Sequence, residues 1–178
     1  MNRIQLRFEV IHEISGTEQM SVILLTNMER SRSISVACDA VMATQVKYRL
    51  NHSDVCKLML PEVLAQLLPS TYEMLIVGVF EGQYQVLLMD LQSGQSLRLR
   101  LSDAVLLHLI ARVPLFIEER LFHSQSYPFE PDNTAVAIPI NTMSLERLKK
   151  LLDRVVEDEN YEMASQIRDE IGRRQKTE

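Results

Sequence analysis

The sequence contains no tryptophan and only two cysteines, Cys38 and Cys56, in 178 residues. Two cysteines at this spacing form neither a zinc-binding pattern nor a disulfide framework, so we expect a reducing compartment. The five glycines are scattered and form no loop that could cradle a phosphate. The five phenylalanines and five tyrosines are not interleaved with basic residues, so no stacking platform for single-stranded nucleic acid is visible.

Long hydrophobic runs are also missing. Residues 1–8 alternate polar and apolar side chains, which is typical of a strand and not of a signal peptide. The longest apolar stretch, residues 105–117, is interrupted by His108, Arg112 and Pro114, whereas a membrane helix needs about 20 apolar residues. The net charge of −5 argues against tight non-specific binding to nucleic acid or to an acidic membrane. We therefore expect a cytoplasmic protein without membrane contact.

The first 126 residues predict one α+β domain, because 46% of the chain is apolar and the period of the apolar residues changes along it. Strands are expected at residues 4–10, 20–26 and 33–36, with a turn at 16–18 and helices at 39–50 and from 54. Pro61 should break or kink the second helix. The pattern then repeats, with strands at 74–80, 84–91 and 97–101 and a helix at 103–112. The order predicts two β-β-β-α units, followed by a short extended segment at 114–117 and a helical turn at 118–122.

Residues 127–143 contain three prolines and predict a linker. Residues 144–178 carry 17 of the chain's 43 charged residues. Two apolar stripes at helical spacing, in residues 145–156 and 161–171, are separated by Asp158-Glu159-Asn160, which predicts a turn and a helix cap. This pattern indicates an antiparallel helical hairpin. A hairpin this short buries little surface alone, so its stripe should pack on a second copy, on the main domain or on a partner.

The C-terminal segment reads Leu148-x-x-Leu151-Leu152 and then Tyr161-Glu162-x-Ala164-x-x-x-Arg168-Asp169-x-Ile171. It resembles the UVR motif, a helical hairpin of bacterial excision-repair proteins and of some protease-associated regulators. The resemblance implies that the hairpin contacts a protein partner or a second copy, which predicts a homo-oligomer. The partner-binding residues that it implies are Tyr161, Glu162, Ala164, Arg168, Asp169 and Ile171.

The first domain is similar to the bifunctional nuclease (BFN) family. The similarity rests on Arg100-Leu101-Ser102-Asp103-Ala104-Val105, on the proline-containing segment 112–117, and on weaker matches at 33–41 and 50–55. It implies hydrolysis of DNA and RNA. Residues at the family's site positions are Asp54, Asp103, Arg100 and Ser102. The family's glutamate falls on Ala40, next to Asp39, and its histidine falls on Ser53, next to His52.

Phosphodiester hydrolysis needs a neutralised phosphate and an activated water, and carboxylates often supply both through a divalent metal. Asp54 and Asp103 could hold Mg²⁺ or Mn²⁺, with Arg100 on the phosphate. The competing interpretation is that Ser53-Asp54 and Ser102-Asp103 are helix caps, each followed by an acid that favours the helix dipole. Two functions therefore stay open: a nuclease tethered to partners by the hairpin, or a catalytically degenerate scaffold or regulatory protein.

Overall fold

The computed structural model describes residues 2–13, 20–68, 71–80, 82–131, 140 and 143–175. The turn expected at 16–18 and most of the expected linker lie outside these residues. The chain divides into two units. The first consists of Met1–Gly78 with Tyr84–Ile138, and the second of Val79–Gln83 with Pro139–Glu178.

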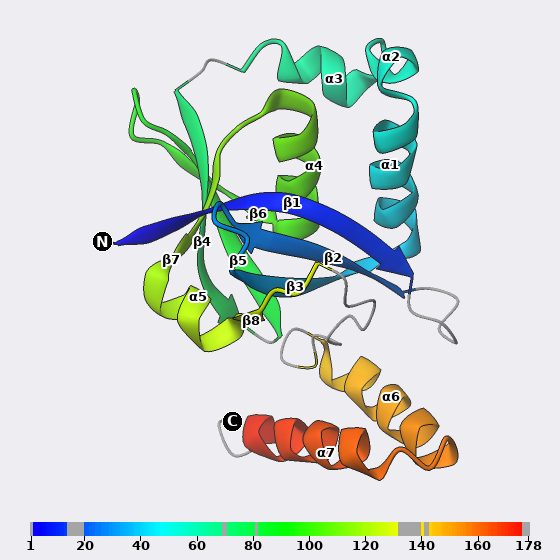
Figure 1. Ribbon diagram of the computed structural model, residues 1–178. Coiled ribbons are helices and arrows are strands. Elements are labelled where there is room, and N and C mark those ends of the chain that lie inside the picture. Colours follow the sequence, from blue (N-terminus) through cyan, green and yellow to red (C-terminus); the bar gives the residue numbers. More distant parts are fainter. Residues whose placement is uncertain are drawn as a thin grey trace. The chain divides into compact units, whose positions relative to one another are not determined.

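The protein has a mixed α+β fold, as the sequence predicts. The described residues form an eight-stranded sheet in the order β6-β5-β4-β7-β1-β2-β3-β8 (Figure 1). Its strands are β1 (Arg3–Glu13), β2 (Met20–Asn27), β3 (Arg32–Asp39), β4 (Tyr72–Phe80), β5 (Gln83–Asp90), β6 (Ser96–Arg100), β7 (Leu115–Glu118) and β8 (Tyr127–Pro128).

Strand β7 joins the two halves of the sheet. It pairs antiparallel with β1, where Leu115 faces Leu6, and parallel with β4, where Leu115 faces Met74. All three side chains are fully buried. The sequence predicts only a short extended segment here, whereas the structure places it at the centre of the sheet. Within β7, buried Leu115 and Ile117 alternate with half-buried residues, which is the pattern of a strand that packs one face into the core.

Helices α1 (Ala40–Asn51) and α4 (Leu101–Ala111) lie side by side and run in the same direction (Figure 1). Three shorter helices complete the described part of the first unit: α2 (Ser53–Cys56), α3 (Leu60–Ala65) and α5 (Glu119–Gln125). The core residues that α1 and α4 contribute are Met42, Ala43, Val46, Leu101, Ala104 and Val105.

The helix starts differ from the predicted ones. Asp39 caps α1, because its Oδ1 accepts a bond of 2.8 Å from the backbone N–H of Met42. The cap positions of α2 and α4 are His52 and Arg100, neither of which makes a side-chain capping bond, so the predicted serine caps are wrong. The helix expected from residue 54 ends at Cys56, and Pro61 lies in the first turn of a new helix, α3, where its missing N–H is not needed.

The described residues of the second unit contain two helices, α6 (Leu145–Glu157) and α7 (Tyr161–Gln175), which we call the C-terminal helix pair. Asn160 caps α7 by accepting a bond of 3.2 Å from the Met163 N–H, as predicted. The two helices pack against each other. Their buried side chains are Leu148, Leu151, Val155, Ala164 and Ile167. No helix in the described ranges is long and apolar enough to cross a membrane.

Candidate active site

Arg100 and Asp103 form the centre of the candidate site, at the start of α4. The guanidinium donates from Nε to Oδ2 at 2.5 Å and from Nη2 to Oδ1 at 3.1 Å. This is the bidentate arrangement of a strong arginine–carboxylate pair. Because α4 follows β6 without a loop, Arg100 is the last residue of the strand and Asp103 lies in the first helical turn. The Arg100 side chain is 68% exposed, so its unused face is open to solvent.

Asp39 belongs to the same neighbourhood. The pKa of Arg100 is raised, first by its hydrogen bond to Asp103, then by the charge of Asp103, and also by the charge of Asp39. Asp39 ends β3 and caps α1, whereas Arg100 ends β6 and precedes α4. Two carboxylates from different parts of the sequence, Asp103 and Asp39, therefore raise the pKa of one guanidinium.

This neighbourhood lies where both long helices of the first unit begin. Helix α1 has 12 residues and α4 has 11, and their N-terminal ends lie at the same end of the helix layer (Figure 1). A helix N-terminus carries about half a positive charge and free N–H groups, which favour an anion such as phosphate. Ser102 is half-buried in the first turn of α4.

Asp54 lies elsewhere. It is in α2, beyond the C-terminal end of α1, and a 12-residue helix is about 18 Å long. Its carboxylate is 88% exposed and accepts a bond of 2.6 Å from Lys57. That hydrogen bond, together with the charge of Lys57, lowers the pKa of Asp54. The structure therefore joins Arg100 with Asp103 and places Asp54 at the other end of α1 from Asp39.

His52, the other residue near the family's histidine position, is occupied locally. Its ring stacks on Tyr48 with 4.6 Å between centroids. Its Nδ1 lies 3.2 Å from the Tyr48 carbonyl oxygen. These contacts hold His52 at the end of α1, on the side of Asp54.

The donors for a metal ion are few. Among the described residues, no group of three or more histidine, cysteine or acidic side chains could hold one. Asp103 and Asp39 are two carboxylates. A Mg²⁺ ion that keeps its water and arrives with a phosphate needs fewer protein ligands than an ion caged by protein alone.

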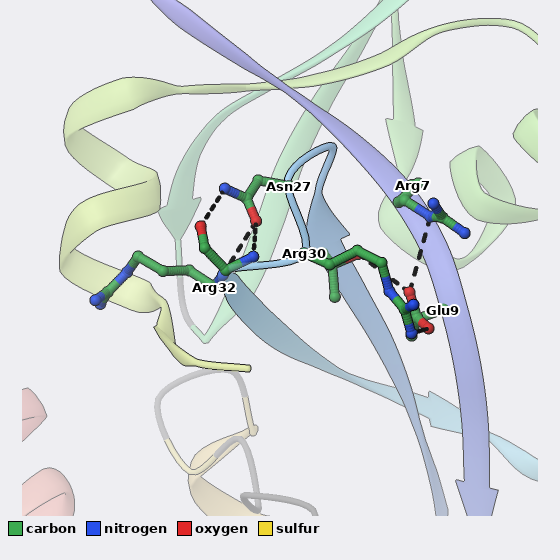
Figure 2. Close-up of polar contacts among 7 residues, drawn as sticks. Arg7, Glu9, Asn27, Arg30 and Arg32 are labelled. Carbon is green, nitrogen blue, oxygen red and sulfur yellow. Dashed lines mark hydrogen bonds and ion pairs between the residues drawn. The ribbon is translucent and has the colours of Figure 1, made fainter. Parts of the chain in front are cut away.

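Arg30 and Arg32, at the turn between β2 and β3, have structural partners (Figure 2). Arg30, at a positive φ of 53°, is bound to Glu9, and Arg32 donates to the Ser126 hydroxyl at 2.7 Å. Asn27 Oδ1 accepts the backbone N–H of Arg32 at 3.0 Å, which fixes the turn. We therefore leave this turn out of the candidate site.

The partner-binding residues that the UVR resemblance implies divide into two groups. Ala164 is buried between the helices, and Ile171 is half-buried. Four others are exposed, namely Tyr161, Glu162, Arg168 and Asp169, and Tyr161 is 68% exposed. The exposed group is available to a partner, whereas Ala164 holds α6 and α7 together.

No protein-family model matches this chain, and no curated protein matches it.

Proposed function

We propose that this protein is a divergent BFN-type nuclease that hydrolyses phosphodiester bonds in DNA or RNA. The observation that carries the proposal is the bidentate Arg100–Asp103 pair at the start of α4, within the electrostatic reach of Asp39. Cationic and anionic side chains next to two helix N-termini suit a phosphodiester, whose charge must be neutralised while a carboxylate handles water.

In this proposal Arg100 binds the phosphate. Its guanidinium prefers bidentate contacts to oxyanions, and its exposure allows a phosphate oxygen to replace an Asp103 oxygen. The released Asp103 carboxylate would then accept a proton from the attacking water, while Ser102 and the α4 N-terminus orient the substrate. The water oxygen would bond to phosphorus as the bond to the leaving sugar oxygen breaks, and solvent would protonate that oxygen. Asp103 and Asp39 would hold a divalent ion brought by the substrate. That ion, Mg²⁺ or Mn²⁺, would supply charge neutralisation.

The proposal changes one detail of the sequence-based site. Asp54 is paired with Lys57 beyond the far end of α1, so we assign the second carboxylate to Asp39. Asp39 is the residue adjacent to the family's glutamate position.

The second candidate function is a catalytically degenerate scaffold or regulatory protein. One observation favours it: both oxygens of Asp103 already accept bonds from Arg100. A carboxylate in this state serves the protein's own structure, and the phosphate would have to displace it. In this alternative, the first unit contacts proteins and has no substrate.

Cleavage of an end-labelled single strand, with Mg²⁺ or Mn²⁺ added, distinguishes the two candidates. The nuclease proposal expects cleavage that falls at least about 100-fold in Asp103→Asn, the range for loss of a general base. The matched control is Asp54→Asn, an equally conservative change of an exposed paired aspartate, which should retain cleavage. No cleavage with either metal, or equal rates in Asp103→Asn and the unaltered protein, would leave only the scaffold.

We also propose that the C-terminal helix pair is a UVR-type contact device that binds the helix pair of a protein partner or of a second copy. What supports this is the exposed row of Tyr161, Glu162, Arg168 and Asp169 beside a buried apolar seam. Tyr161→Glu should reduce that association without unfolding α7, since Tyr161 is exposed. Gln166→Glu adds the same charge at another exposed position and should have no effect. Association that survives Tyr161→Glu would contradict this role.

A further inference from the structure

The segment from the end of α1 through α3 presents an unusually apolar surface. Six leucine and valine side chains are at least half exposed within 18 consecutive residues, which we call the Leu58 surface: Leu50 (50%), Val55 (64%), Leu58 (91%), Leu60 (68%), Leu64 (51%) and Leu67 (75%). Helix α3 contributes no buried residue at all. Single exposed apolar residues need no explanation, but six within 18 consecutive residues point to an interaction site.

The Leu58 surface is held in a fixed shape. Arg49 of α1 binds Glu62 of α3 through Nε at 2.5 Å and Nη2 at 3.1 Å. Arg49 is also bound to Gln45 Oε1 at 2.7 Å. A six-residue helix without a buried face does not form alone. The ion pair, together with packing of α3 on α4, therefore orders α3 before any partner arrives.

The charges in this segment cancel. Residues 48–67 contain four charged side chains, and each is paired with another: Arg49 with Glu62, and Lys57 with Asp54. The whole chain carries −5, whereas this segment carries none. Two copies of the chain can therefore meet here without like-charge repulsion, although they repel each other elsewhere.

The size of the surface fits a two-fold contact. Side chains of this type carry on the order of 100 Å² of apolar area each. With the exposed fractions given above, the six side chains together expose roughly 400 Å² of apolar area. A standard interface buries about 800 Å² per partner, of which a little over half is apolar. Homodimer interfaces are the more apolar ones, and a two-fold axis brings the same patch from both copies together.

We propose that the Leu58 surface is the interface of a homodimer of this chain. The occupant is a second copy, because the surface is apolar, electrically neutral, pre-ordered and of the size that one half of such an interface needs. This dimer does not depend on the nuclease proposal or on the C-terminal helix pair.

The molar mass of the full-length protein in solution, from light scattering or sedimentation, tests the proposal. We expect twice the 20.5 kDa of one chain, and one chain mass in both Leu58→Glu and Leu67→Glu. Leu91→Glu and Leu97→Glu are matched controls, since these residues are 61% and 67% exposed but lie outside the surface. They should keep the double mass. If the unaltered protein is larger than a dimer, Leu58→Glu should halve its mass.

A single-chain mass for the unaltered protein at every soluble concentration would overturn the proposal. So would an unchanged mass in Leu58→Glu, or an equal loss in Leu91→Glu. Tyr161→Glu separates this interface from the C-terminal helix pair. If Tyr161→Glu abolishes the dimer while Leu58→Glu leaves it intact, the Leu58 surface is not the interface, and the partner role of the helix pair stands.

Discussion

Arg49 of α1 and Glu62 of α3 form an ion pair whose side chains are only 5% and 12% exposed. Two hydrogen bonds join them, and they connect two helices that are separated in the chain by α2. Removing one member of a buried pair leaves an uncompensated charge. The pair therefore helps to hold α3 in place, together with the packing of α3 on α4.

Glu62→Ala should lower the free energy of unfolding by about 3 kcal/mol, because Arg49 would stay buried without its partner. Urea unfolding followed by circular dichroism measures this loss. Asp54→Ala, which removes the acid of the exposed Lys57 pair, is the control and should leave the urea midpoint almost unchanged. Equal midpoints for Glu62→Ala and the unaltered protein would show that the pair does not stabilise the fold.

Arg112 ends α4 in the left-handed region, with φ of 57°. This conformation costs a residue with a Cβ about 1 kcal/mol, whereas glycine adopts it without steric strain. Arg112→Gly should therefore raise the free energy of unfolding by roughly 0.5–1 kcal/mol. Arg154→Gly, inside α6, is the opposite case and should destabilise the helix pair. A loss of stability in Arg112→Gly would contradict this reading of the helix end.

Cys38 should be unreactive in the folded protein. Burial, followed by the charge of Asp39, raises the pKa of its thiol to about 11, and the thiolate is the reactive form. Cys56 is also buried, at 2% exposure. A colorimetric thiol reagent at pH 8 should therefore label neither cysteine in the native state and both in denaturant. Rapid labelling of the native protein would show that these residues are not enclosed.

Asp90 should make stability depend on acid pH. Its carboxylate accepts bonds from Ser93 Oγ at 2.6 Å, from the Gln92 N–H at 3.0 Å and from Thr71 Oγ1 at 3.0 Å. The hydrogen bond from Ser93, followed by that from Gln92, lowers the pKa of Asp90 below its usual 3.8. Because this pKa is lower in the folded than in the unfolded protein, the ionised carboxylate stabilises the fold when the pH is above the unfolded-state pKa. This stabilisation disappears as the pH falls through the folded-state pKa.

The urea midpoint of Asp90→Ala should therefore lie below that of the unaltered protein at pH 7, and the difference should shrink as the pH falls below 3.8. Asp153→Ala offers a comparison, since Asp153 is an exposed aspartate on α6. A difference between Asp90→Ala and the unaltered protein that persists unchanged at pH 2 would exclude the carboxylate as its source.

Much of the fold is predictable from the sequence because it depends on local periodicity. The alternation of Ile4, Leu6 and Phe8 predicts β1, and the four-residue repeat of Met42 and Val46 predicts α1. The central position of β7 was not predictable, since it depends on pairing with β1 and β4, which lie far away in the chain. Spacing along the sequence carries no information about which strands become neighbours.

The candidate site was predictable in part for the same reason. Arg100 and Asp103 are three residues apart at a helix start, so their pairing follows from helical geometry. Whether Asp39 or Asp54 lies nearer to Arg100 and Asp103 depends on the direction of α1, which no local sequence pattern predicts. The Arg49–Glu62 pair joins residues 13 apart across two turns and leaves no signal in the sequence.

We expect phosphodiesters to bind where α1 and α4 begin. Titration of short single-stranded DNA into isotope-labelled protein, followed by backbone amide NMR shifts, tests it most directly because it needs no catalysis. We predict shifts concentrated in residues 39–43 and 100–104, and a loss of these shifts in Arg100→Gln. Shifts confined to residues 54–57, or no shifts at saturating DNA, would contradict the claim.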